Sequence, residues 1–149
     1  MPLTADDKIE IQELLARYCL TADSGDDAWA DLFAPDGQWL AQTARLRKPE
    51  EFRAHIAAYR ERPTMQKTKH RMTNIVIEEL DDAGDRARVV SDVMNIRIDQ
   101  DGPKITFIGM YEDVVKKVDG RWLFELRKMS RENILYVDHG IEELFTTDE

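Results

Sequence analysis

Two residues of the sequence, an aspartate and a histidine, could carry acid–base chemistry. Asp23 stands at the predicted end of the first helix, where the helix dipole disfavours a carboxylate. His70 opens a predicted strand, and imidazole is the side chain that takes and returns protons near neutral pH. Each also has a simpler interpretation: Asp23 as part of an Asx turn with Ser24 and Gly25, and His70 as a strand-edge residue among basic neighbours. The two residue types suit acid–base chemistry, but their spacing in the sequence does not by itself show that the two side chains contact each other.

Other familiar site patterns do not occur in the sequence. The three histidines, His55, His70 and His139, have no short spacing to one another, and with one cysteine they form no metal-ligand signature. A Gly-rich phosphate loop and a dinucleotide fingerprint are also missing. Cys19 lies in the predicted first helix, where nothing nearby in sequence lowers the pKa of its thiol. We therefore expect neither a metal nor a cofactor.

The composition limits the classes of partner. The chain has 149 residues with 21 Lys and Arg against 30 Asp and Glu, a net charge of -9. Phosphate backbones and anionic membrane surfaces repel such a chain, so we expect no nucleic-acid or membrane partner. One cysteine excludes an internal disulfide, no signal peptide is visible, and uncharged stretches fall far short of the ~20 residues of a membrane span. We expect one cytoplasmic domain over residues 1–149.

The elements that must position Asp23 and His70 begin with helices. Thr4 and Asp7 resemble a capping box, and the apolar residues that follow recur at helical spacing until Gly25. We expect a short helix over 27–33, a turn over 34–37 and a short strand over 38–42. A further helix is predicted to begin at Pro49 and to stop before Pro63.

The second half of the sequence is predicted to be extended. A first strand carries Met72, Asn74 and Val76 on the side of His70, and further strands are predicted over 86–98, 105–118 and 121–131. Consecutive hairpins make neighbours of sequential strands, so we expect an antiparallel sheet behind the helices, an α+β fold. Residues 132–149 form a predicted C-terminal tail that covers the sheet or a neighbouring subunit.

Three groups of segments resemble SnoaL-like proteins, which belong to the nuclear-transport-factor-2-like superfamily. They are residues 11–18 with 23–26 and 32–37, the strand 70–74, and residues 109–113 with 119–122. The resemblance covers nearly the whole chain, from residue 5 to residue 131. It implies a cone-shaped α+β barrel, in which a strongly curved antiparallel sheet encloses a pocket and the N-terminal helices close its open side.

The resemblance also pairs the two candidate residues. In scytalone dehydratase and lindane dehydrochlorinase, an Asp at the position of Asp23 pairs with a His at the position of His70. This implies that His70 moves the proton while Asp23 holds the other ring nitrogen. Four further side chains are expected to bind substrate, with core packing or, for the arginine, a solvated strand position as the alternative: Tyr18, Trp39, Tyr111 and Arg127.

The implied function is a cofactor-free lyase, dehydratase-like, or an isomerase that acts on a small, largely apolar cyclic or aromatic molecule. The sequence departs from scytalone dehydratase at Ala22, where that enzyme has a tyrosine, and in the predicted strand 86–98, which lacks its second histidine. That substrate is therefore not carried over. Two alternatives remain: a non-catalytic subunit resembling the small subunits of ring-hydroxylating dioxygenases, and a small-ligand carrier. We expect a homodimer or homotrimer in each case.

Overall fold

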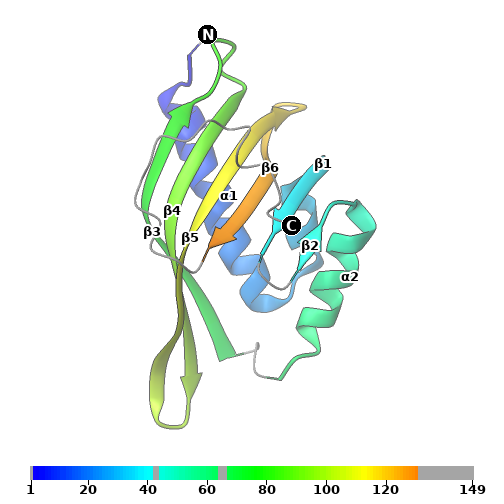
Figure 1. Cartoon of the computed structure of the whole chain (residues 1–149), viewed down its shortest axis with the longest axis vertical. Coiled ribbons are helices and arrows are strands. Elements are labelled where there is room, and N and C mark those ends of the chain that lie inside the picture. The colour runs from blue at the N-terminus through cyan, green and yellow to red at the C-terminus, as the bar shows by residue number, and fades with distance from the viewer. Residues whose placement is uncertain (1, 42–43, 64–66, 131–149) are drawn as a thin grey trace.

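The computed structural model describes residues 2–41, 44–63 and 67–130. It has helices packed on one six-stranded sheet, which confirms the predicted α+β fold class (Figure 1). The helical elements are α1 (Ala5–Ser24), the 3-10 helix η1 (Asp27–Leu32) and α2 (Pro49–Arg60). The strands are β1 (Phe33–Leu40), β2 (Arg45–Leu46), β3 (Thr68–Glu79), β4 (Arg86–Asp99), β5 (Gly102–Val118) and β6 (Arg121–Ser130). The predicted C-terminal tail lies outside the described residues.

The sheet is open and mixed. Its strand order is β2-β1-β6-β5-β4-β3, so β2 and β3 form its two edges. The four long strands pair antiparallel in sequential hairpins, as predicted, whereas β1 joins β6 in parallel. The predicted turn over 34–37 belongs to β1, which already begins at Phe33 and carries a register shift between Phe33 and Gln38.

Helix α1 is fixed at both ends. Thr4 Oγ1 accepts a hydrogen bond from the Asp7 amide at 3.1 Å, and the Asp7 carboxylate accepts one from the Thr4 amide at 3.0 Å, which is the predicted capping box. The helix ends at Gly25, whose φ of 65° is the left-handed conformation that glycine adopts without strain. Arg60, at the end of α2, donates from Nε to the Gly25 carbonyl at 2.8 Å. The last turn of α2 is therefore held against the end of α1.

The face of the sheet that packs against α1 carries rows of side chains, because directly opposed residues of paired strands point to the same face. The row that contains His70 lies at the C-terminal end of α1, and Trp122, near the opposite end, contacts Asp7. From the His70 end, four rows are His70, Asn95 and Phe107; Met72, Val93 and Gly109; Ser91, Tyr111 and Met129; and Val89, Asp113, Arg127 and Trp39. The inner face thus carries polar residues among apolar ones.

The predicted alternation along β3 is wrong beyond residue 73. Asn74 has a φ of 53°, and the pairing with β4 shifts register between Thr73 and Val76. This β-bulge turns Asn74 outward, where its amide donates to Asp92, and leaves Val76 exposed. Ile75 and Ile77 instead pack against the core with Met72. His70 and Met72 precede the bulge, so they lie on the same side of the strand, as predicted, and this side faces the core.

Candidate active site

Asp23 and His70 meet at the junction of α1 and β3. The distance between His70 Nδ1 and Asp23 Oδ1 is 2.6 Å. The backbone amide of His70 also donates to both carboxylate oxygens, at 3.0 Å and 3.2 Å. The Asp23 side chain is 3% exposed and the His70 side chain 11%. An ionised carboxylate only accepts hydrogen bonds, so Nδ1 carries the proton in this contact and the unprotonated nitrogen of the neutral ring is Nε2.

The local sequence explains how the two side chains come together. Asp23 occupies the last turn of α1, and Gly25 ends that helix directly after it. His70 is the third residue of β3, on the inner face, and α1 packs along this strand. The helix dipole disfavours a carboxylate at the C-terminal end of α1. The hydrogen bonds from the backbone amide of His70 to Asp23 offset this effect. The edge strand β3 has this amide free of the ladder, so one residue supplies both contacts to Asp23.

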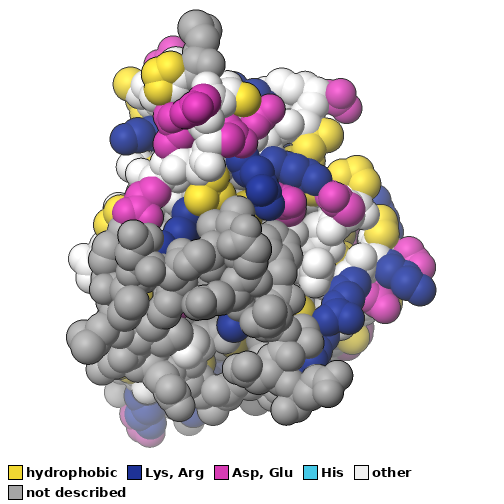
Figure 2. Space-filling view, turned by 45° about the horizontal axis from the view of Figure 1, so that its top comes forward, with side chains coloured by type: hydrophobic (Ala, Val, Ile, Leu, Met, Phe, Trp, Pro, Cys, Tyr) yellow, Lys and Arg dark blue, Asp and Glu magenta, His cyan; other side chains and the backbone are white. Residues whose placement is uncertain are grey.

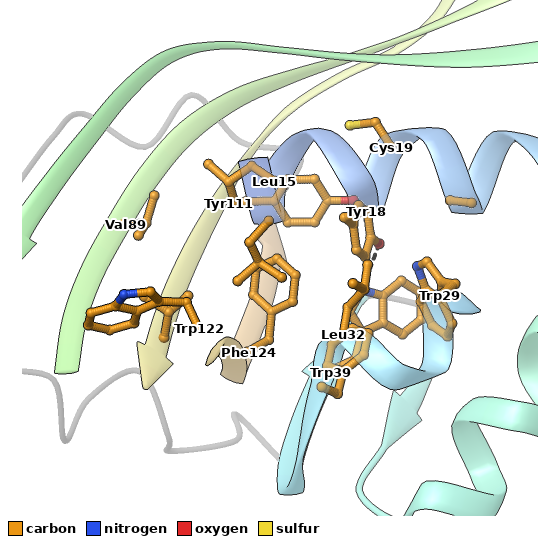
Figure 3. Close-up of a cluster of buried hydrophobic side chains, with 14 of the residues drawn as sticks. Leu15, Tyr18, Cys19, Trp29, Leu32, Trp39, Val89, Tyr111, Trp122 and Phe124 are labelled. Carbon is orange, nitrogen blue, oxygen red and sulfur yellow. Dashed lines mark hydrogen bonds between the residues drawn. The ribbon is translucent and has the colours of Figure 1, made fainter. Parts of the chain in front are cut away.

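Two phenols and an indole form a hydrogen-bonded chain beside this pair. Trp39 Nε1 donates to Tyr18 Oη at 3.1 Å, and the hydroxyls of Tyr18 and Tyr111 are 3.4 Å apart (Figure 3). Burial raises the pKa of both tyrosines, so both stay protonated at neutral pH. The mutual contact uses one of the two phenolic protons. Within the described part of the chain, the second proton has no recorded acceptor. The Tyr18 ring also meets the His70 ring edge-on, with 6.5 Å between centroids.

Arg127 is fully buried below these phenols. Its guanidinium carbon lies 4.0 Å from the centre of the Tyr18 ring and 3.7 Å from that of Tyr111. Its Nη2 contacts Met72 Sδ at 3.6 Å and Asp113 Oδ2 at 3.3 Å. Burial raises the pKa of Asp113 to about 7, although the Arg127 charge acts in the opposite direction. The positive charge of Arg127 is therefore only partly offset near neutral pH.

All six predicted site residues thus lie in one connected region. Asp23 and His70 are in direct contact, Tyr18 touches the His70 ring, and Trp39, Tyr111 and Arg127 surround Tyr18. Trp39, Tyr111 and Arg127 are also members of the buried core, so packing and a polar role coexist in these side chains. The side chains of the predicted set come from α1 and from four strands of the sheet.

The sequence reasoning missed two polar groups in this region. Asn95 Oδ1 is buried and lacks a hydrogen-bond partner among the described residues, and Asn95 is directly opposite His70. The Tyr59 hydroxyl is likewise buried and unbonded within those residues, in the last turn of α2, which Arg60 holds against Gly25. A polar residue in phase with inward-facing valines of β4 was the available signal for Asn95. No such signal marked Tyr59, because a tyrosine on the apolar face of a helix usually belongs to the hydrophobic core.

The other titratable residues of the region offer different chemistry. Burial raises the pKa of the Cys19 thiol to about 11, so it is protonated and unreactive at neutral pH. His55 packs between Trp29 and Trp39, and burial lowers its pKa. Among residues 2–41, 44–63 and 67–130, no group of three His, Cys, Asp or Glu side chains is placed to hold a metal ion.

A groove of about 940 Å³ lies against a different face of α1 and contains none of the six residues. Its walls come from α1, η1, α2 and the β5–β6 hairpin, and include Leu14, Phe52 and Trp122. Two ion pairs, Arg17 with Glu13 and Arg53 with Asp31, lie on exposed side chains among its lining residues. The groove is lined by carboxylates such as Glu10, Asp31 and Asp119 but contains no histidine, whereas the Asp23–His70 contact lies outside it.

Comparison with known proteins agrees with this architecture. The sequence profile of the SnoaL-like domain matches residues 4–128. The chain belongs to the SnoaL-like family. No curated protein matches it. A protein of unknown function from Mycobacterium tuberculosis has 28% identity and a TM-score of 0.73, over 87% of this chain and 73% of that chain. A protein of unknown function with a cystatin-like fold from Nostoc punctiforme has 26% identity and a TM-score of 0.77, over 91% and 98%.

More distant structures share the fold of this SnoaL-like chain. One from Novosphingobium aromaticivorans, described as a candidate scytalone dehydratase, has 22% identity and a TM-score of 0.70, over 87% of this chain and 89% of that chain. At that identity the likeness concerns the fold alone. A protein from the same organism, described as NTF2-like with a cystatin-like fold, has 20% identity and a TM-score of 0.75, over 95% of this chain and 90% of that chain, and so shares the fold. No helix in the described part of the chain is both long and apolar enough to cross a membrane.

Proposed function

We propose that this SnoaL-like protein is a cofactor-free lyase or isomerase in which His70 is the general base and acid. The observation that carries the proposal is the contact between His70 Nδ1 and Asp23 Oδ1 at 2.6 Å, in a nearly buried setting. A carboxylate on Nδ1 fixes the tautomer, leaves Nε2 as the proton acceptor and stabilises the imidazolium that forms. The substrate is a small, largely apolar cyclic or aromatic molecule with an acidic C–H bond next to a carbonyl.

The proposed reaction begins with proton transfer from carbon. His70 Nε2 takes the proton next to the carbonyl, and the C–H electron pair forms an enolate. In a lyase reaction the enolate re-forms the carbonyl, its electrons make a C=C bond, and the C–O bond of a β-hydroxyl group breaks. The imidazolium of His70 returns its proton to the departing hydroxide, and water leaves. In an isomerase reaction, the same proton returns to a different carbon of the substrate.

The enolate oxygen is the place where negative charge develops. The spare phenolic proton of the Tyr18 and Tyr111 pair is a suitable donor to that oxygen, because both phenols stay protonated. Arg127 supports the same charge through the two tyrosine rings on which it stacks. Trp39 fixes the direction of the Tyr18 hydroxyl from below. Each of the four predicted substrate-binding residues thus has a distinct proposed role.

The test uses a chromogenic elimination. The β-hydroxy derivative of benzylacetone loses water to give benzylideneacetone, whose conjugated chromophore appears as the reaction proceeds. We expect His70→Ala to lower the rate ~100- to 10,000-fold, which is the usual contribution of a positioned base. His55→Phe removes the other described imidazole while keeping a ring between Trp29 and Trp39, and should retain activity. Wild-type turnover by His70→Ala would contradict the proposal.

A second readout covers the isomerase reaction. Benzylacetone itself has no leaving group, and exchange of its α-protons in deuterated water reports proton abstraction alone. We expect wild-type protein to catalyse this exchange and His70→Ala to lose it. If the wild type catalyses neither exchange nor elimination, the carrier alternative is favoured. Stoichiometric co-purification with a larger iron-containing subunit would instead favour the small-subunit alternative.

A further inference from the structure

Asn95 is a half-buried polar residue opposite the proposed base, and the oxygen of its side-chain amide is covered. In the sheet register Asn95 of β4 is directly opposite His70 of β3. Directly opposed residues in an antiparallel pair have Cβ atoms about 4.5–5.5 Å apart and point to the same face. Asn95 therefore shares the inner face with His70, in the same row, with Phe107 on its other side.

The oxygen of the Asn95 amide has no hydrogen-bond partner within residues 2–41, 44–63 and 67–130. This atom, Oδ1, is fully covered and accepts no hydrogen bond from any described residue. Besides the pairing of its strand, the backbone carbonyl of Asn95 accepts a hydrogen bond from Thr106 Oγ1 at 3.4 Å. An unpaired buried amide oxygen is destabilising, so proteins rarely keep one without a use. The outward-facing Asn74 on the neighbouring strand shows the contrast, since its amide donates to Asp92.

The chemistry of the surroundings determines what this amide can bind. Asp23 occupies Nδ1 of His70, so ligand chemistry takes place at Nε2. The phenols of Tyr18 and Tyr111 and the Arg127 cation favour oxygen atoms that accept hydrogen bonds. A free amide oxygen in the His70 row is complementary to a different group, one that donates. A hydroxyl is such a group, and the amide nitrogen can bind the same oxygen when the hydroxyl leaves.

We propose that Asn95 binds a hydroxyl group of the ligand next to His70, so that the substrate is a hydroxylated compound. This inference rests on the proposed function for its chemistry and on the Asn95 position for its geometry. In the elimination described above, Asn95 holds the β-hydroxyl within reach of the imidazolium that returns the proton. Asn95 is then a residue that contacts the substrate and sets its specificity.

The test compares two probes that differ only in the hydroxyl group, benzylacetone and its β-hydroxy derivative. Equilibrium dissociation constants for both are measured on the full chain by NMR titration. We expect the wild type to bind the hydroxy compound about 5- to 10-fold more tightly, the contribution of one neutral hydrogen bond. Asn95→Val removes the amide, keeps a strand-forming side chain, and should bind both probes equally.

Matched variants separate binding from folding. Asn74→Gly removes an amide from the outer face of the same strand pair, suits the φ of 53°, and should keep the wild-type ratio. Asn95→Val eliminates an unpaired polar atom, so its thermal stability should equal or exceed that of the wild type. If the amide had a structural role, the substitution would instead lower the thermal stability. Asn95→Ala is a second variant, used if Asn95→Val does not fold. It should also lose the tighter binding of the hydroxy compound.

The outcomes distinguish this inference from the proposed function. Retention of the hydroxyl preference in Asn95→Val or Asn95→Ala overturns the inference, as does equal or absent binding of the probes by the wild type. If the preference depends on Asn95 while His70→Ala still catalyses elimination, the binding contact stands and the acid–base proposal fails. If His70→Ala is inactive while the preference survives without Asn95, only the present inference fails.

Discussion

The buried pair of Asp113 and Arg127 is the residue-level feature with the clearest dependence on pH. Burial raises the pKa of Asp113 from its ordinary value of 3.8 to about 7. Between these two values the folded protein holds a proton that the unfolded chain has released. The contribution of Asp113 to stability therefore falls as the pH rises from about 4 to about 7. At higher pH, Arg127 supplies the opposite charge that the ionised carboxylate needs.

Asp113→Asn should remove this dependence. The amide is isosteric with the protonated acid, so we expect the variant and the wild type to differ little below pH 4. The free energy of unfolding of the variant should then gain on that of the wild type as the pH rises to 7, by at most about 4 kcal/mol. Urea denaturation at pH values on both sides of this window measures the difference. A constant difference across the window would contradict the assigned ionisation of Asp113.

Single residues also show what the sequence could and could not predict. His70 and Asp23 were predictable because their motifs match a known family, and Tyr18 and Arg127 for the same reason. Asn95 and Asp113 were not, because an amide or an acid at an alternating strand position looks like an exposed residue until the partner strands are known. The importance of Asn95 follows from a covered amide oxygen without a hydrogen-bond partner among the described residues, and that of Asp113 from burial beside Arg127; only the packed sheet reveals either feature.

At the level of elements, Asp7 connects the start of α1 to the β5–β6 hairpin. Besides closing the capping box, its Oδ1 accepts hydrogen bonds from Trp122 Nε1 at 3.0 Å and from Lys117 Nζ. The Lys117 ammonium and the Thr4 contacts hold the pKa of Asp7 well below its usual range. Asp7 therefore stabilises the fold above pH 4, and this contribution is lost as the pH falls below about 4.

Asp7→Asn should destabilise the protein by about 2 kcal/mol at neutral pH, through loss of the charged partner of Lys117 and weakening of the cap. Asp6→Asn, an exposed change in the same helical turn, is the matched control and should have little effect. Thermal or urea unfolding measures both variants. Equal stability of the two variants would show that α1 is not anchored through Asp7.

Helix boundaries were predicted more accurately than strand phase. The capping box and Gly25 mark the ends of α1 through local chemistry, which the sequence carries directly. The bulge at Asn74 depends on pairing with β4, and the parallel addition of β1 depends on its meeting β6 across the whole chain. Both features depend on contacts between residues far apart in the sequence. An alternating pattern of apolar residues cannot predict them, because one bulge reverses the inward and outward sides for every later residue.

At the scale of the whole molecule, charges of both signs are interspersed over the described surface. Figure 2 shows acidic and basic side chains intermixed on one face, and the ion pairs of Lys116 with Asp36 and of Arg86 with Glu125 each join two strands that have a third strand between them. In Figure 1 the far ends of β4 and β5 extend beyond the helices. Three large apolar side chains on these two strands are exposed: Ile98, Ile105 and Ile108.

This projecting hairpin bears on the homo-oligomer that we expect from the family resemblance. Ile105 is 57% exposed and Ile108 is 58% exposed, and exposed apolar side chains that lie close together commonly mark protein contacts. We predict a homodimer or homotrimer in light scattering, and a lower average mass when both isoleucines are replaced by threonine, which keeps the β-branched shape. An unchanged assembly would place the subunit contact elsewhere, and a monomeric wild type would refute the oligomer.

The coupling of Asp23 to His70 is the central claim, and an NMR titration of the histidine ring nitrogens tests it most directly. Nitrogen shifts of wild type and of Asp23→Asn are compared across the pH range in which imidazole ionises. We predict that the His70 ring keeps the Nδ1-protonated tautomer and that Asp23→Asn abolishes this preference, while the nitrogen shifts of His55 stay unchanged. If the His70 nitrogens show no fixed tautomer, or ignore the substitution, the Asp23–His70 pair does not operate and the proposed chemistry is wrong.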